Sequence, residues 1–314
     1  MNQFFPADDI KNCDGVTEPL LVVQVTEMKD GVFIGYCYNH LVADGVSMWG
    51  FISTWSKICS SGSGSGHKPL ALKGWFLEGI DYPIHIPVAE AERPPPSCEL
   101  SSVVPVTKDR VFHFTKKNIS DLKAKANSEV SSSDITISSL QAVSAHMWRS
   151  IIRHSGLSGE GETHCKVVVN VRRRLNPPLE KDCFGTMVYT RPAHSQLERA
   201  KLVNSQTNEN CKQFAEDWVR NVKNIKTGVG SRMVGDSLLV TSSLRFEVYN
   251  IDFGWGKPIA VRAGPGNNIS GKLVLFPGRG EDSIDVQTTL FTNVLVNLLT
   301  DVEFLKHVTT STMV

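Results

Sequence analysis

The sequence lacks the features that mark secreted, membrane-spanning and nucleic-acid-binding proteins. Its 7 cysteines are odd in number and widely spaced, without a Cys-x-x-Cys pair, which predicts reduced thiols rather than a disulfide framework or a zinc site. No apolar run is long enough to span a bilayer, and the N-terminus has no basic and apolar regions of a secretory signal. The net charge of +1 gives no bulk attraction to nucleic acid or to an anionic membrane. We therefore expect a cytoplasmic protein with no membrane span, no nucleic-acid partner and no bound metal. We also expect a monomer.

What the sequence does contain is the composition of a globular protein and a clear opening pattern. The 314 residues, 41% hydrophobic and 21% charged, are enough for two ordinary domains. Residues 20–28 and 32–40 are rich in β-branched and aromatic residues, and a Lys-Asp-Gly turn separates them, which predicts a hairpin. After Gly45, apolar residues recur at helical spacing, at Met48, Phe51, Ile52, Trp55 and Cys59. The stretch HLVADG at 40–45 is thus predicted to be a strand-to-helix turn.

The rest of the chain predicts a mixed α/β fold. Residues 67–107 contain a Pro triplet and no apolar period, so we interpret them as a connection between residues 1–66 and a second domain, 108–314. Helices are predicted over 118–127, over 135–154 with caps at 131–134, over 204–223, and from 293 to about 305. Strands are predicted over 110–115, 166–171, 236–246, 258–263, 271–276 and 283–289.

His40 and Asp44 form an H-x-x-x-D pair whose chemistry the residues alone leave open. A histidine that acts as a general base needs a pKa near the working pH, a fixed tautomer and access to substrate. The same pattern also fits a strand-end histidine that only caps a turn. A metal site would need more ligands, and neither H-E-x-x-H nor a carboxylate cluster lies beside the pair. A second, independent signal is needed to favour catalysis.

That signal is DFGWG at 252–256. Its two glycines predict positive φ angles or a backbone packed closely against a neighbour. By itself the stretch is typical of a rigid turn around a buried tryptophan, without a reactive group. It gains a functional meaning only together with the first motif.

Together, HLVADG and DFGWG resemble the plant BAHD acyltransferases, in which an HxxxD motif precedes a DFGWG motif. NVRRRLNPPLEKDCFG at 170–185 resembles the family's Arg-containing strand and Phe-Gly segment, and LQAVSAHMWR at 140–149 resembles its central helix. The stretches GWFLEGIDYPI and VTSSLRFEVY are most similar to a subgroup of uncharacterised HxxxD-type acetyltransferases. The resemblance covers essentially the whole chain. It implies two chloramphenicol-acetyltransferase-like α/β domains with the active-site channel between them.

The resemblance also implies a mechanism. His40 is expected to take a proton from the hydroxyl or amine of a small plant metabolite, which then attacks the thioester of an acyl-CoA. Asp44 is expected to point away from the channel and to pair with Arg172, with Arg174 as the alternative partner. Acyl-CoA is the expected co-substrate, and no permanently bound cofactor is expected.

Further site residues are implied by position in the family motifs. Thr241, eleven residues before Asp252, is expected to help hold the oxyanion. Asp252 and Trp255 are expected to support the structure of the site without direct chemistry. Thr136 and Ser138 are the candidates for binding CoA, and both fit ordinary helix-capping hydroxyls equally well.

The sequence departs from the family pattern in two places. Ser243 stands where some members that use hydroxycinnamoyl donors carry a Trp, which argues against shikimate or quinate esters. In the family HxxxD lies about a third of the way along, so His40 is early, and roughly the first hundred residues of an incomplete N-terminal domain are expected to be absent. A non-catalytic remnant of the fold is therefore an alternative. Condensation domains and chloramphenicol-type acetyltransferases share H-x-x-x-D-G, but Asn39 replaces the second His of the condensation motif.

Overall fold

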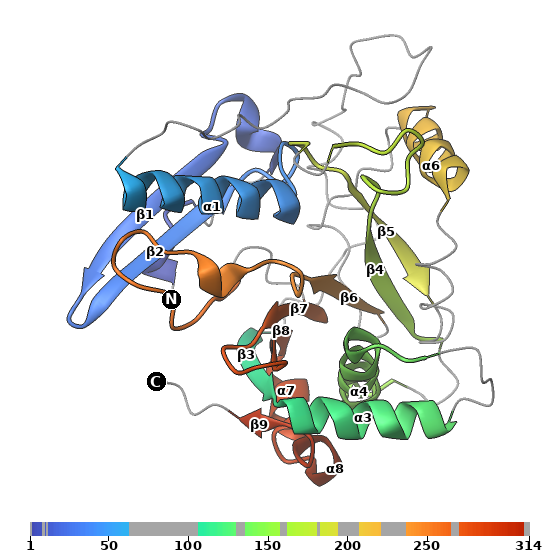
Figure 1. Ribbon diagram of the computed structural model, residues 1–314. Helices are drawn as coiled ribbons and strands as arrows, with labels where there is room; N and C mark the ends of the chain where they lie inside the picture. The colour runs from blue at the N-terminus through green and yellow to red at the C-terminus, as the bar shows by residue number, and fades with distance from the viewer. Residues whose placement is uncertain are drawn as a thin grey trace.

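The computed structural model describes residues 2–7, 10, 12–62, 106–129, 136–157, 162–180, 183–193, 207–220, 237–264 and 270–310. The described residues form a two-stranded sheet and a seven-stranded sheet with helices beside them (Figure 1). The predicted mixed α/β class is confirmed. The connection predicted at 67–107 lies almost entirely outside the described residues, so the division into two domains stays a prediction.

The N-terminal part is the predicted hairpin followed by a helix. Strand β1 (Leu21–Met28) pairs antiparallel with β2 (Gly31–Tyr38), and α1 (Gly45–Ser61) lies along the hairpin (Figure 1). The ring of Tyr36 on β2 meets Trp49 on α1 edge to face, with centroids 6.3 Å apart. Two short 3-10 helices, η1 (Asn2–Phe4) and η2 (Asn12–Val16), precede β1. The contact between Tyr36 and Trp49 packs α1 against the hairpin.

The larger sheet has the strand order β5-β4-β6-β7-β8-β3-β9. Strand β4 pairs parallel with β6, and β6 parallel with β7, while the other neighbouring pairs are antiparallel. The strands are β3 (Thr107–Phe114), β4 (His164–Asn170), β5 (Val188–Ala193), β6 (Ser237–Ser242), β7 (Lys272–Pro277), β8 (Ile284–Phe291) and β9 (Thr309–Thr310). Strands β5 and β9 were not predicted from the sequence.

Helices cover one face of this sheet. The main hydrophobic core lies between the sheet and these helices. The helices of this part are α3 (Lys116–Glu129), α4 (Ser139–His154), α6 (Asn208–Arg220), α7 (Thr292–Leu298) and α8 (Val302–Leu305), with the short 3-10 helix η4 (Val248–Asn250). Alternate residues of the strands enter the core because successive side chains of a strand face opposite sides. Phe112 on β3, Val286 on β8 and Met147 on α4 are all fully buried there.

Several predicted helix boundaries are wrong. Helix α4 begins at Ser139 rather than at 135, because Ser138 and Gln141 form a capping box there. The caps predicted at 131–134 lie outside the described residues. The single helix predicted from 293 to 305 is two helices, since the side chain of Asp301 accepts the N–H of Phe304 and starts α8 anew.

Two strand predictions also fail. Strand β6 ends at Ser242, and the chain then turns instead of continuing to 246. Residues 258–263 are not a strand, although they lie beside β8. The amide side chain of Gln287 on β8 accepts the N–H of Ala263 at 2.8 Å and donates to its C=O at 2.7 Å. A side chain thus provides the hydrogen bonds that a neighbouring strand would have provided.

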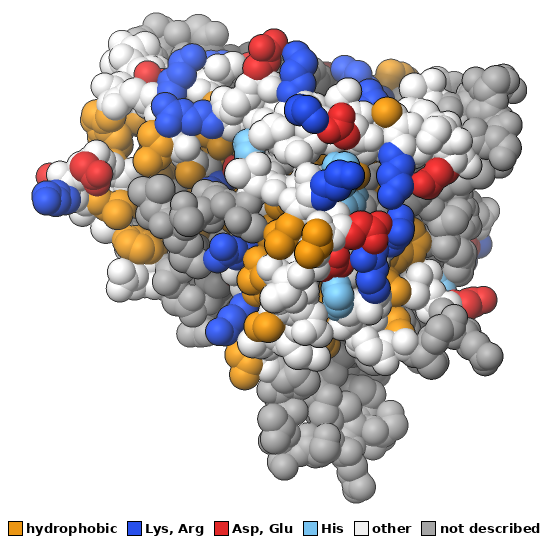
Figure 2. Space-filling view, turned by 90° about the horizontal axis from the view of Figure 1, so that it is seen from below, with side chains coloured by type: hydrophobic (Ala, Val, Ile, Leu, Met, Phe, Trp, Pro, Cys, Tyr) orange, Lys and Arg blue, Asp and Glu red, His pale blue; other side chains and the backbone are white. Residues whose placement is uncertain are grey.

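Charges of both signs are interspersed on the face formed by the helices under the larger sheet (Figure 2). Arg153 lies 3.1 Å from Asp301 and 2.8 Å from Glu303, and Arg149 lies 2.9 Å from Glu303. The two pairs with Glu303 are partly exposed, so each of them contributes little to stability.

His146 makes the stability of this part depend on pH. Its ring stacks on Phe304 with centroids 5.3 Å apart, and burial lowers the pKa of His146 from 6.5 to about 4. The unfolded chain therefore takes up this proton at higher pH than the folded chain does, and the free energy of unfolding falls as pH drops from 6.5 to about 4. Between pH 6.5 and about 4, the free energy of unfolding in urea is expected to fall less for His146→Leu than for the wild type. Equal falls would contradict this account.

Candidate active site

The turn between β2 and α1 places His40 and Asp44 in opposite environments. His40 is exposed, and its ring lies over that of Tyr38, with centroids 5.6 Å apart. Asp44 is 1% exposed and is the N-cap of α1, where its Oδ1 accepts the N–H of Ser47 at 3.1 Å. An Asp suits this position because its side chain satisfies a free N–H of the first helical turn. The turn thus presents the histidine and buries the aspartate.

Asp44 forms a bidentate ion pair with Arg172, which follows β4. Arg172 Nη1 donates to Asp44 Oδ2 at 2.6 Å, and Nη2 donates to Oδ1 at 3.0 Å. Arg172 is 3% exposed, and its Nε donates to the C=O of Cys183 at 3.1 Å. Both charges are therefore compensated in a buried setting where an unpaired charge would be costly.

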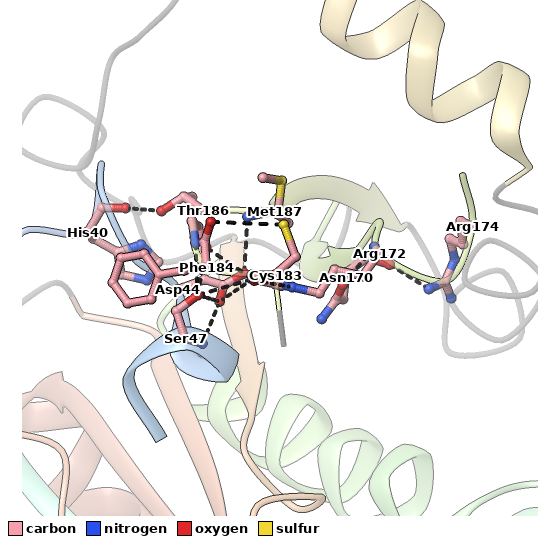
Figure 3. Close-up of polar contacts among 11 residues, drawn as sticks. His40, Asp44, Ser47, Asn170, Arg172, Arg174, Cys183, Phe184, Thr186 and Met187 are labelled. Carbon is pink, nitrogen blue, oxygen red and sulfur yellow. Dashed lines mark hydrogen bonds and ion pairs between the residues drawn. The ribbon is translucent and has the colours of Figure 1, made fainter. Parts of the chain in front are cut away.

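The predicted Asp44–Arg172 pairing is confirmed, and the alternative partner is not used. Arg174 Nη1 donates instead to the C=O of Asn170 at 2.7 Å, and its side chain lies apart from Asp44 (Figure 3).

The segment 183–187 makes hydrogen bonds to the first residues of α1 and to its N-cap. Met187 N–H donates to Asp44 Oδ2 at 3.0 Å, and Gly185 C=O accepts the N–H of Asp44 at 3.3 Å. Ser47 Oγ contacts both the N–H and the C=O of Gly185, each at 3.0 Å. Sequence reasoning missed Ser47. Its place three residues after a helix-capping Asp was the available signal.

Tyr38 adds an apolar and uncharged neighbour to His40. Burial, followed by the nearby charge of Asp44, raises the pKa of Tyr38 to about 12. Burial also raises the pKa of Tyr36 on the same strand. Both phenols are therefore neutral at physiological pH, and the ring that His40 contacts brings no charge of its own.

Thr241 is on β6, half-buried, with its Oγ1 donating to Leu273 C=O in β7 at 3.3 Å. Within the described part of the chain, no hydrogen bond joins Thr241 to His40. The neighbouring Ser243 donates its N–H to Leu275 C=O at 2.8 Å. The structure thus places Thr241 at the end of a central strand of the larger sheet, and its role at the oxyanion stays a prediction.

The DFGWG turn has the predicted positive φ angles at its glycines, but its tryptophan is exposed rather than buried. Asp252 Oδ1 accepts the N–H groups of Gly254 at 2.7 Å and Gly256 at 3.0 Å, and both glycines have positive φ. Trp255 is 67% exposed, so the prediction of a buried tryptophan is wrong. Phe253 faces inward instead and meets Trp55 of α1 edge to face at 4.8 Å. Phe253 joins this turn to the helix that begins at Gly45.

The backbone requirement at Gly256 can be measured separately from crowding. Its φ is 105°, and no heavy atom lies within 4 Å of an added Cβ. Gly256→Ala is therefore expected to lower the free energy of unfolding in urea by about 1–3 kcal/mol through strain alone. Gly50 in α1 is the matched control, since it also has open space around it but no positive φ. Gly50→Ala is expected to raise stability by about 0.5–1 kcal/mol, and a similar sign at both positions would contradict this account.

Thr136 and Ser138 are both exposed at the start of α4. Ser138 Oγ accepts the N–H of Gln141 at 3.3 Å, and Gln141 Oε1 accepts the N–H of Ser138 at 2.7 Å, so Ser138 is a helix cap. A cleft of about 830 Å³ opens beside this cap, between α3 and the turn after β7. Its polar lining includes Lys116, Ser120, Lys123, Ser139, Asp282 and Ser283.

The described residues show neither a membrane-spanning helix nor a metal centre. None of the helices in the described ranges is long and apolar enough to cross a membrane. Within the same ranges, no group of three or more His, Cys, Asp or Glu side chains is placed to hold a metal ion.

Comparison with known proteins identifies the family. The sequence model of the Transferase family matches residues 1–305. An uncharacterised acetyltransferase of Arabidopsis thaliana is 58% identical over 316 residues, which cover 96% of this protein and 71% of the relative. The BAHD acyltransferase DCR of the same plant is 30% identical, over 96% of this protein and 66% of the relative. The chain belongs to the BAHD acyltransferase family. The predicted family is thereby confirmed.

Among solved structures, Fusarium graminearum TRI101 in complex with coenzyme A and deoxynivalenol shares the fold of this BAHD protein. The TM-score is 0.70 at 17% identity, and the match covers 95% of this protein and 72% of TRI101. At this identity the likeness concerns the fold alone, and it agrees with the predicted acyltransferase architecture.

Proposed function

We propose that this BAHD protein moves an acyl group from an acyl-CoA thioester to a hydroxyl or amine of a small plant metabolite. The observation that carries the proposal is the buried Asp44–Arg172 pair, which fixes the turn and leaves the His40 side chain exposed. The names of the relatives support acyl transfer, and the coenzyme A in the TRI101 complex supports a CoA thioester as donor.

His40 is the proposed general base. Its imidazole takes the proton of the acceptor's hydroxyl or amine, and the acceptor oxygen or nitrogen bonds to the thioester carbonyl carbon. The tetrahedral oxyanion then collapses, the carbon–sulfur bond breaks, and the imidazolium returns the proton to the CoA thiolate. Attack is direct, so no acyl-enzyme forms, and the sequence has no G-x-S-x-G nucleophile elbow.

The other proposed residues act around this base. Asp44 is a positioning residue, because its oxygens are occupied by Arg172, Ser47 and Met187 and are not free to take a proton. Thr241 is the proposed donor to the oxyanion. Removal of one such donor typically lowers the rate by about 10²–10³.

The cleft beside α4 is the proposed place for the CoA phosphates. The start of a helix attracts anions through its free N–H groups, and Lys123 adds positive charge to the lining, whereas Lys116 is paired with Asp282 at 2.8 Å. Thr136 and Ser138 lie next to this cleft in sequence and stay the proposed CoA contacts, although Ser138 also serves as the cap of α4. Asp252 and Trp255 are proposed only to support the turn against α1.

The proposed function is tested by following thiol release and product formation together. The 314-residue protein is incubated with short, long and aromatic acyl-CoAs and with alcohol and amine acceptors. We expect thiol release that depends on the acceptor, with an equal amount of acylated product detected by mass spectrometry. A folded protein that releases no thiol with any pair would contradict the proposal and would favour the non-catalytic alternative.

A further inference from the structure

The backbone of His40 is held by two side chains that come from distant parts of the sequence. Its N–H donates to Asn12 Oδ1 at 2.9 Å, across 28 residues. Its C=O accepts from Thr186 Oγ1 at 2.6 Å, across 146 residues. One contact comes from η2 and the other from the segment before β5. The backbone groups on both sides of the His40 Cα atom are therefore hydrogen-bonded.

The Asn12 contact belongs to a small network that satisfies the start of the turn. Asn39 is 8% exposed, and its Nδ2 donates to Asn12 C=O at 2.7 Å. Asn39 Oδ1 accepts the N–H of Leu41 at 3.0 Å, and Asn39 C=O accepts the N–H of Val42 at 3.2 Å. The turn therefore depends on the segment that carries Asn12 for part of its shape.

The Thr186 contact belongs to the structure that holds Asp44. Thr186 lies between Gly185 and Met187, whose backbone groups both bond to Asp44. Figure 3 shows the Thr186 hydroxyl directed at the C=O of His40. Any shift of this segment relative to Asp44 would therefore also shift His40.

The imidazole ring itself has little to fix it. Within the described part of the protein, no hydrogen bond to the His40 ring is present, and its ring neighbour is Tyr38, with centroids 5.6 Å apart. The placement of the ring thus depends mainly on the position of its backbone. A base must lie within hydrogen-bond reach of the proton that it accepts, so an error of backbone position is transmitted to the reaction.

We propose that Thr186 and Asn12 are positioning residues that hold the backbone of His40 at the reacting distance. This rests on the proposed role of His40 as base. Both residues contact the backbone of His40, and neither is proposed to touch the reacting atoms. Loss of either hydrogen bond leaves a partly exposed backbone group that water can satisfy, so catalysis is affected more than folding.

Thr186→Val tests the proposal because it replaces the hydroxyl by a methyl group of similar size. We expect kcat for thiol release to fall by about tenfold, with little change in KM for the acyl-CoA, because small misplacements of a catalytic group slow the chemical step. Thr186→Ser keeps the hydroxyl and is expected to retain most of the activity. Asn12→Asp keeps the accepting oxygen and is expected to lose less than Asn12→Leu.

Thr292→Val is the matched control. Thr292 Oγ1 also donates to a distant backbone carbonyl, that of Val106, at 2.9 Å, but it lies at the start of α7 and outside the proposed site. We expect wild-type kcat for this variant. If Thr186→Ser were as slow as Thr186→Val, or Thr186→Val as fast as the wild type, the proposal would be overturned.

Hydrogen–deuterium exchange tests the positioning role of Thr186 independently of the proposed acyltransferase activity. Amides of residues 39–47 are expected to exchange faster in Thr186→Val than in the wild type, while urea unfolding of the two proteins stays the same. If the wild type releases no thiol, the acyltransferase proposal fails, and faster exchange would still support the positioning contact. Unchanged exchange over these residues would overturn the positioning role whatever the activity.

Discussion

His40→Ala is expected to lower kcat for acyl transfer by about 10²–10⁴, the usual contribution of a positioned general base. The side chain is exposed, and the described residues give it ring contact with Tyr38 but no hydrogen bond, so its loss removes the proton acceptor without removing support for the turn. Steady-state thiol release at saturating acyl-CoA and acceptor gives the ratio of kcat values.

The control for His40→Ala is its stability. Substitutions of exposed residues outside special features usually change the free energy of unfolding by less than about 0.5 kcal/mol. Urea unfolding of His40→Ala is therefore expected to match the wild type, so that the lost activity is not lost folding. A stable variant with wild-type kcat would show that His40 is not the base.

Arg172→Met is expected to lower the free energy of unfolding by about 3–5 kcal/mol, because it leaves a buried carboxylate without its charged partner. Methionine keeps much of the apolar stem of Arg172 but none of the donors to Asp44, Cys183 and Gly185. Urea unfolding measures the loss. Thiol release is expected to fall as well, since the turn that carries His40 depends on the pair.

Two further variants make the Arg172 result specific. Arg220 pairs with Glu216 at 3.5 Å but is 70% exposed, so Arg220→Met is expected to change stability by about 0–1 kcal/mol. The double variant Arg172→Met, Asp44→Asn removes both charges and is expected to recover part of the stability lost in Arg172→Met. Equal effects of Arg172→Met and Arg220→Met would contradict the importance of the buried pair.

The strongest sequence signals were local or came from the family resemblance. The hairpin and α1 follow from alternation and helical spacing, which depend only on neighbouring residues. The Asp44–Arg172 pair joins residues 128 apart, and the resemblance, not any periodicity, pointed to it. The contacts of Asn12, Ser47 and Thr186 were not predicted, because small polar residues carry no pattern that reveals which distant carbonyl or carboxylate they will meet.

The failed predictions have local physical causes. Residues 258–263 were predicted as a strand, but Gln287 takes the place of the neighbouring strand's hydrogen bonds. The last predicted helix breaks where Asp301 can cap a new one. Trp255 is exposed because Phe253 faces Trp55 in its place, and the sequence does not show which aromatic residue of DFGWG faces inward.

The role of His40 as the general base is tested by chemical rescue of His40→Gly with free imidazole in the thiol-release assay. We expect the variant to fold, to be slow without imidazole, and to become faster as imidazole is added, because the free base replaces the missing ring beside the acceptor. His40→Gly that transfers acyl groups as fast as the wild type without imidazole would contradict the claim that the turn held by Asp44 and Arg172 exists to present a base.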